Sequence, residues 1–226
     1  MSERLLKARE PEDDGLRVQT AALVLKLRAL GLADRAVLKA METVPRALFV
    51  PPEWRDQAYE DRSLPIDCGQ TIGTPSLVAQ MTAALELSDR HSVLEIGTGS
   101  GYQAAVLSRL ARRVTTIDRY RTLVRTADAR WKELGIRNVS GVVADGALGW
   151  KLQAPFDRIL VTASFEAAPS RLVSQLTDSG ILIAPIGRPG KVQRLTLFQR
   201  IGQNVDTRDI GPVRLVPIVP GVAQSL

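Results

Sequence analysis

The spacing of apolar residues changes near residue 92 and divides the chain into two parts. In the first part, apolar positions recur every three or four residues, as on one face of a helix. Asp34 is suited to cap the second of these helices, and Pro75 to occupy the first turn of the third. The helices are predicted at 16–30, 35–43 and 75–87. The first helix carries apolar residues at Val18, Ala21, Ala22, Leu25 and Ala29.

From Ser92 onward, short apolar runs alternate with helical patterns. The alternation favours a parallel sheet with helices on both faces. Residues 193–198 alternate apolar and polar side chains, which is typical of an antiparallel edge strand. The predicted fold is therefore an α/β, doubly wound, mostly parallel sheet with an N-terminal helical extension and an antiparallel C-terminal edge. Strands are expected at 92–96, 113–117, 139–143, 158–162 and 180–185, and helices at 102–110, 123–134 and 169–176.

The length of 226 residues suits one domain rather than two. We expect the polar residues 1–15 to form a flexible arm and residues 16–226 to form a single domain that works as a monomer. Within it, residues 16–90 provide the helices and an irregular loop at 54–74, and residues 91–226 provide the sheet. Irregular stretches of this length inside a compact domain are often functional.

Charge and residue usage exclude several classes of site. Lys and Arg number 30 against 24 Asp and Glu, which gives a net charge of +6, but no basic run appears, so we expect no nucleic-acid partner. Cys68 is the only cysteine and His91 the only histidine, so neither an internal disulfide nor a metal site is expected. Because no segment has the apolar length of a membrane span or a signal peptide, we expect a cytoplasmic protein without a membrane partner.

The most informative motif follows the predicted strand 92–96 and opens the next helix. Residues 95–101 read EIGTGSG. Glycines permit a tight turn and close approach of the backbone to a ligand, and the helix N-terminus offers unpaired N–H groups. Dinucleotide-binding folds use a related turn, but their third glycine comes one residue later. The spacing instead resembles the class I methyltransferase fingerprint, which binds S-adenosylmethionine. The candidate cofactor-binding residues in this loop are Glu95, Gly97, Thr98, Gly99 and Gly101.

Acidic residues also end the next two predicted strands, at Asp118 and Asp145. In open parallel sheets, ligands bind outside the carboxyl ends of the strands. Asp118 is suited to accept hydrogen bonds from both ribose hydroxyls, and it is equally suited to cap the following helix. By the methyltransferase resemblance, Asp145 bonds the adenine amino group and Gly146 lets the backbone meet the ring. Glu95 is suited to lie near the sulfonium or the ammonium group of the cofactor.

Across residues 16–217 the chain resembles one family. The motifs that carry the resemblance are VPRALFVPP at 44–52, AYED at 58–61, LPIDCGQTI at 64–72, PFDRILVTA at 155–163 and VRLVP at 213–217. They are similar to those of the protein-L-isoaspartate (D-aspartate) O-methyltransferases. The resemblance implies the Rossmann-like fold of class I methyltransferases.

The resemblance also implies a reaction and a substrate site. The family transfers a methyl group from S-adenosyl-L-methionine, leaving S-adenosyl-L-homocysteine, to the α-carboxylate of L-isoaspartyl residues in damaged proteins or peptides. The ester closes to a succinimide, and hydrolysis returns some normal aspartate, so the methylation initiates repair. The 54–74 loop is expected to cover the cofactor. Substrate-binding residues implied by the resemblance are Gln70, Thr71, Ile72, Thr162, Ala163 and Arg214.

The acceptor loop departs from the family at its proposed catalytic residue. The family reads GQTISQP where residues 69–75 read GQTIGTP, so Gly73 replaces the serine. A carboxylate is already ionised at neutral pH and needs no general base, so the enzyme has to supply alignment and water exclusion. Thr71, Thr74 or a water molecule are the candidates to replace the hydroxyl. The departure predicts a weakened or altered activity as readily as a normal one.

Three functions are consistent with these residues. The first is isoaspartyl repair, and the second is methylation of another peptide or small-molecule carboxylate. The third is a cofactor-binding protein with little turnover, which the loss of the serine motivates. The positive charge adds an RNA methyltransferase as a rival, although the family match across residues 45–72 counts against it. Methyl transfer to an isoaspartyl peptide, compared with the matching aspartyl peptide, separates the first three.

Overall fold

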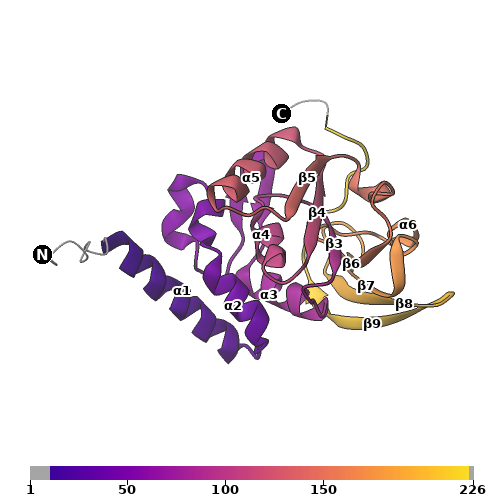
Figure 1. Cartoon of the computed structure of the whole chain (residues 1–226), viewed down its shortest axis with the longest axis horizontal. Coiled ribbons are helices and arrows are strands. Elements are labelled where there is room, and N and C mark those ends of the chain that lie inside the picture. Colours follow the sequence, from indigo (N-terminus) through magenta and orange to yellow (C-terminus); the bar gives the residue numbers. More distant parts are fainter. Residues whose placement is uncertain (1–10, 224–226) are drawn as a thin grey trace, which may run out of the picture.

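The computed structural model describes residues 11–223 and places side chains from Gly15 onward. Three N-terminal helices lie together beside the sheet (Figure 1): α1 (Pro11–Ala29), α2 (Arg35–Thr43) and α3 (Pro75–Ala84). The predicted bounds of α2 are confirmed, and the Asp34 carboxylate accepts the N–H of Val37 at 2.9 Å as its cap. Helix α3 begins at Pro75 as predicted and ends three residues early.

Helix α1 differs from its prediction in its start and in its buried face. Residues 11–15, assigned to the arm from sequence, are helical; proline is common in the first turn of a helix because its missing N–H has no partner there. The rest of the predicted arm, residues 1–10, lies outside the described residues. The side chains that α1 buries are Thr20, Leu23 and Leu27, whereas Val18 and Leu25 are exposed.

The segment between α2 and α3 is more regular than predicted. It forms short 3-10 turns η1 (Arg46–Phe49), η2 (Pro52–Gln57) and η3 (Asp67–Gly69), and a small antiparallel sheet of β1 (Leu64–Ile66) and β2 (Gln70–Ile72). Strands of three residues are too short to give a periodic pattern, which is why the sequence suggested only loop. The hairpin brings Gln70 and Thr71 close to the carboxyl ends of the central strands of the main sheet.

A seven-stranded sheet forms the centre of the molecule, in the order β5-β4-β3-β6-β7-β8-β9. The first five strands in this order are parallel, and β8 and β9 are antiparallel, so the predicted fold class is confirmed. The bounds of β3 and β5 are those predicted. The strands are β3 (Ser92–Ile96), β4 (Arg113–Asp118), β5 (Val139–Val143), β6 (Phe156–Val161), β7 (Leu176–Ile186), β8 (Gln193–Ile201) and β9 (Asn204–Val213).

Two predictions for the C-terminal part are wrong. The helix predicted at 169–176 is only α6 (Ser170–Val173), because Leu176 pairs with Phe156 and begins β7. The strand predicted as the edge, β8, has a neighbour on both sides, and the edge is β9. The first residues of β9 are exposed on both faces, so this strand lacks the alternation by which a half-buried strand is recognised.

Helices cover both faces of the sheet and define two clusters of core residues. On one face, α4 (Tyr102–Ser108) and α5 (Arg121–Glu133) pack with α1–α3 around Tyr102 and Trp131. On the other face, Phe156 and Leu172 belong to a smaller cluster beside α6. The chain leaves β3 toward β4 and returns to β6 on the opposite side of β3. This reversal opens a crevice beyond the carboxyl ends of β3 and β6, where open α/β sheets bind their ligands.

Candidate active site

A cavity of about 330 Å³ occupies this crevice. Its floor is the carboxyl end of the sheet, and its sides come from segments far apart in sequence. Volumes of this order are typical of small-molecule sites. Most of the lining residues belong to 70–71, 96–99, 117–120, 162–163 and 216–219.

The glycine loop between β3 and α4 forms one wall of the cavity. Gly97 and Gly99 line it, and Gly97 (φ +98°) donates its N–H to the Ile117 carbonyl at 2.8 Å. A Cβ on Gly97 would collide with the Thr162 hydroxyl, so only glycine fits there. Gly101 does not line the cavity. Its φ of +88° and the Ala127 side chain, 2.7 Å from where a Cβ would stand, make it necessary for packing against α5.

Asp118 ends β4 with its carboxylate at the cavity wall. One oxygen accepts the N–H of Gly99 at 2.9 Å and the other accepts the N–H of Tyr120 at 3.0 Å. Burial raises the pKa of Asp118, and the backbone hydrogen bonds oppose this rise. Asp118 therefore links the end of β4 to the glycine loop, and its carboxylate keeps lone pairs beyond the two that these N–H groups occupy.

The structure separates the roles of Asp145 and Gly146. The Asp145 carboxylate accepts the N–H of Ala147 at 2.9 Å and caps the short turn η4 (Gly146–Leu148), and it is not among the lining residues. Gly146 does line the cavity, and a Cβ on it would stand 2.6 Å from the Ile96 side chain. Gly146 therefore lets the backbone line the cavity. The Asp145 carboxylate instead stabilises the turn η4.

Glu95 is not brought to the cavity. Its side chain is fully buried beside β4, and neither carboxylate oxygen has a hydrogen-bond partner among the described residues. Burial raises the pKa of Glu95 to about 8, with Thr116 opposing the rise and Asp118 adding to it. Burial thus favours the neutral acid over the carboxylate at Glu95, whereas the sequence suggested a carboxylate near the sulfonium or the ammonium group of the cofactor.

A smaller cavity of about 80 Å³ adjoins the first. Thr98 of the glycine loop and Tyr102 and Gln103 of α4 line one side of it. Ile72 and Gly73, at the end of the hairpin, also line it. Both cavities share a boundary. The residues that line both are Thr71, Gly97, Gly99, Thr162 and Val216.

The hairpin residues predicted for the acceptor divide between the cavities. Gln70 lines the larger cavity, Ile72 and Gly73 line the smaller one, and Thr71 lines both. Thr74 lines neither. Its hydroxyl oxygen accepts the Leu77 N–H at 3.2 Å and caps α3 instead.

The strand end after β6 and the segment after β9 complete the boundary. The Thr162 hydroxyl is within 3.0 Å of the carbonyls of Ile96 and Gly97, to which it donates, and Ala163 lines the larger cavity. Arg214 is exposed and lines neither cavity, whereas its neighbours Leu215 and Val216 line the smaller one.

Sequence reasoning missed part of the larger cavity. Arg119 and Tyr120 line it directly after Asp118, and residues 216–219 close one side. Arg119 and Tyr120 directly follow a predicted strand, so their place at the carboxyl end of the sheet could have been predicted. Val216 and Pro217 end the VRLVP motif, whereas Ile218 and Val219 lie in no motif; Ser164 holds this segment by donating its N–H to the Val216 carbonyl and accepting the N–H of Ile218.

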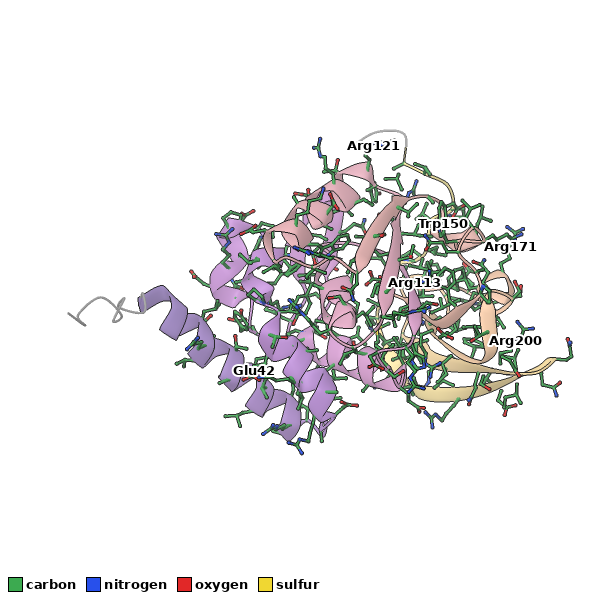
Figure 2. The ribbon with its side chains drawn as sticks, in the orientation of Figure 1. Glu42, Arg113, Arg121, Trp150, Arg171 and Arg200 are labelled. Carbon is green, nitrogen blue, oxygen red and sulfur yellow. The ribbon has the colours of Figure 1, made fainter. Side chains whose placement is uncertain are left out.

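Among the residues that line the two cavities, only Arg119 is basic. Arg113, Arg121, Arg171 and Arg200 belong to four different elements (Figure 2). Within residues 11–223, no group of acidic, cysteine or histidine side chains is arranged to hold a metal ion. In the same part of the chain, no helix is both long and apolar enough to cross a membrane.

The family model described as Protein-L-isoaspartate(D-aspartate) O-methyltransferase (PCMT) matches residues 18–223. The chain is 54% identical over 215 residues to the protein-L-isoaspartate O-methyltransferase of Azorhizobium caulinodans, a match that covers 95% of this chain and 99% of the relative. It is 51% identical over 215 residues to that of Xanthobacter autotrophicus, covering 95% and 98%.

Solved structures of the same name share the fold. One protein-L-isoaspartate O-methyltransferase has a TM-score of 0.80 at 28% identity, over 90% of this chain and 67% of the other. A second, from Plasmodium falciparum in complex with S-adenosyl-L-homocysteine, has a TM-score of 0.75 at 22% identity, over 88% and 97%. The chain therefore belongs to the protein-L-isoaspartate(D-aspartate) O-methyltransferase family, the S-adenosylmethionine-dependent methyltransferases of isoaspartate repair.

Proposed function

We propose that the two adjoining cavities divide the reaction between them. The larger one binds S-adenosyl-L-methionine and the smaller one admits the α-carboxylate of an L-isoaspartyl residue. The observation that carries this proposal is their common boundary at Gly97, Gly99 and Thr162, because methyl transfer requires the two reactants to meet in line.

The residues around the larger cavity fit the cofactor. Asp118 has lone pairs left for ribose hydroxyls after it accepts two backbone N–H groups. The backbone at Gly97, Gly99 and Gly146 lines the cavity directly, and at Gly97 and Gly146 a Cβ would clash with neighbouring side chains. The solved relative from Plasmodium falciparum binds S-adenosyl-L-homocysteine, the product expected here. When bound, S-adenosyl-L-methionine supplies a methyl group on a positively charged sulfur.

The chain's own residues then have to place an ionised carboxylate and exclude water. Ile72 and Gly73 border the space for the acceptor, and Thr98 borders it from the cofactor loop. The Thr162 hydroxyl already donates to two carbonyls, so it holds the strand end and leaves substrate binding to others.

Thr71 is the residue we favour to replace the hydroxyl of the family's serine. It is exposed, and it lines both cavities. Thr74 is committed to capping α3 and stands outside the cavities. Arg214, although it lies outside both cavities, is placed to meet the peptide on the surface next to Leu215.

The test is methyl transfer from labelled S-adenosyl-L-methionine to an isoaspartyl peptide and to the matching aspartyl peptide. We expect labelling of the first alone. Binding of S-adenosyl-L-homocysteine, measured by calorimetry, is the parallel readout. Binding without labelling of either peptide would favour a protein with little turnover, and labelling of another carboxylate in preference would favour the second candidate function.

We further infer that the described residues form one domain, which begins with α1 rather than at residue 16, and that the protein acts as a monomer in the cytoplasm, without nucleic-acid or membrane partners. One core cluster includes Leu27 of α1, Tyr102 of α4 and Val93 of β3, which supports a single domain. Arg113, Arg121, Arg171 and Arg200 lie on four separate elements (Figure 2), and the lack of a basic run in the sequence argues against a nucleic-acid surface. Light scattering after size exclusion, and a gel-shift assay with RNA, test these inferences.

A further inference from the structure

Arg46 is a buried cation that the reaction described above does not use. It begins η1 and is fully buried. Its Nε donates to the Ala58 carbonyl at 2.8 Å, and its Nη2 donates to the Gly73 carbonyl at 2.7 Å. The guanidinium carbon lies 4.9 Å from the centre of the Tyr102 ring.

Arg46 is buried without an ion pair among the described residues. Burial lowers the pKa of Arg46, and Tyr102, Asp61 and Tyr59 oppose the shift. Asp61 is itself engaged, because one of its oxygens accepts the Ser76 N–H at 2.8 Å. Burying a charge is costly unless hydrogen bonds compensate it. The compensation here comes from two loop carbonyls and one aromatic ring.

Two of the groups that Arg46 holds border the smaller cavity. Gly73 is the position of the family's serine, and Tyr102 is the first residue of the helix that follows the cofactor loop. Phe49 packs edge-on against the Tyr102 ring, with ring centres 5.5 Å apart. The Arg46 guanidinium therefore contacts both the acceptor loop, at Gly73, and the first residue of α4, Tyr102.

We propose that Arg46 is a positioning residue for the methyl acceptor, which fixes the Gly73 carbonyl relative to Tyr102 and so sets the shape of the smaller cavity. The proposal rests on the function proposed above for that cavity. Arg46 acts through Gly73 and Tyr102 and does not itself line the cavity.

The glycine makes this support more important in this chain. Gly73 has no side chain, and no described atom lies within 4 Å of the place where its Cβ would stand. Its backbone therefore has the wide conformational freedom of a glycine, and no packed Cβ restrains it. The hydrogen bond from Arg46 is its one side-chain restraint from the described residues.

The test compares Arg46→Met with Arg158→Met. Arg158 is partly buried, donates to the carbonyls of Leu85, Glu86 and Asp157, and lines neither cavity. The readouts are the Kd of a fluorescent isoaspartyl peptide in the presence of S-adenosyl-L-homocysteine, the KM of that peptide, and the Tm. The Kd of S-adenosyl-L-homocysteine is measured separately.

For Arg46→Met we expect the peptide Kd and KM to rise about tenfold, equivalent to about 1.4 kcal/mol. The Kd of S-adenosyl-L-homocysteine should change less than twofold. Arg158→Met should lower the Tm and leave the peptide Kd unchanged. If Arg46→Met, like Arg158→Met, lowers the Tm and leaves the peptide Kd unchanged, Arg46 has only a structural role and the proposal is overturned. If Arg46→Met does not fold, the same comparison is made with Arg46→Lys, which keeps the charge and can donate to the Gly73 carbonyl alone.

A double-mutant cycle with Gly73→Ala tests the route of action. Alanine restricts the backbone at a position where its Cβ meets no described atom. If Arg46 works by holding Gly73, the rise in peptide Kd caused by Arg46→Met is smaller in the alanine background. If Arg46→Met raises the peptide Kd equally in both backgrounds, Arg46 does not act by holding Gly73. A wild-type protein that neither binds nor methylates the peptide would instead refute the function proposed for the smaller cavity.

Discussion

The carboxylate of Asp118 accepts the backbone N–H of Gly99 at 2.9 Å. This bond joins the end of β4 to the middle of the glycine loop at the wall of the larger cavity. The same side chain that is proposed to meet the ribose hydroxyls thus also holds the loop beneath the cofactor. Its two duties make Asp118 the residue on which cofactor binding should depend most.

Asp118→Asn is expected to weaken S-adenosyl-L-homocysteine binding at least tenfold. The amide keeps one acceptor oxygen but presents a donor where a second N–H or hydroxyl arrives. Calorimetry gives the Kd, and Asp128→Asn on the exposed face of α5 is the matched control. An unchanged Kd would remove Asp118 from the proposed ribose site.

Gly97→Ala should impair both folding and cofactor binding. Its φ of +98° is strained for alanine, and the new Cβ collides with the Thr162 hydroxyl. We expect a cost of about 1–3 kcal/mol in the free energy of unfolding. Gly202→Ala is the control, since Gly202 has a φ of +60° but no described atom close to the added Cβ. Chemical denaturation of both variants measures the difference, and equal losses would mean that the collision is relieved.

Thr71→Val and Thr74→Val should fail in different ways. Thr74→Val removes the cap of α3 and should cost about 1 kcal/mol of stability. Thr71→Val removes a hydroxyl that borders both cavities, so its main effect should be on kcat for the isoaspartyl peptide. Denaturation curves and initial rates of both variants check this. A larger fall in kcat for Thr74→Val would reverse the assignment.

Gly73→Ser restores the family's serine in a space that is open. The serine Cβ would meet no described atom within 4 Å, so we expect the free energy of unfolding to change by less than about 0.5 kcal/mol. Since an ionised carboxylate needs no base, kcat should change less than tenfold. A larger gain in isoaspartyl methylation would show that the hydroxyl is a missing contributor to this chain's catalysis.

Stability should fall as pH rises, because of Glu95. Its pKa is about 8 in the folded protein against an ordinary value of 4.5, so between these values the folded state keeps a proton that the unfolded state has lost. The contribution is fully present below pH 4.5 and is lost as pH rises toward 8, by at most about 1.4 kcal/mol per pH unit. Denaturation of the wild type and of Glu95→Gln across this range gives the difference. Parallel curves would contradict the assignment.

The sequence predicted the sheet well where apolar runs are short and buried. Strand β3 is buried along its whole length and has its predicted bounds, because a parallel strand covered on both faces reads as a short, mainly apolar run. Strand β5 lies at the edge of the sheet and is only partly buried, yet its valines still indicate its bounds. The acidic residues at strand ends were found for the same reason, and Asp118 does reach the cavity. Asp145 does not, because its carboxylate satisfies the N–H of Ala147 at the next turn.

Other features could not be predicted because they depend on tertiary contacts. The apolar pattern of α1 indicates Val18 and Leu25, yet the helix turns Leu23 and Leu27 inward. Alanines count as apolar positions in such a pattern, but their small side chains bury little apolar surface. Arg46 stands inside a motif that was recognised, but nothing local tells a buried arginine from an exposed one. Its burial follows only from the approach of residues 58, 73 and 102.

The larger cavity takes its walls from segments between residues 70 and 219, which are distant in sequence. A partly folded chain that has formed β3, β4 and α4 but not the C-terminal segment therefore has no complete binding site. Ligand binding then reports the finished fold, and a bound cofactor stabilises the whole molecule by mass action rather than any one part of it. A cell in which the cofactor is plentiful would thus hold more of this enzyme in its native state.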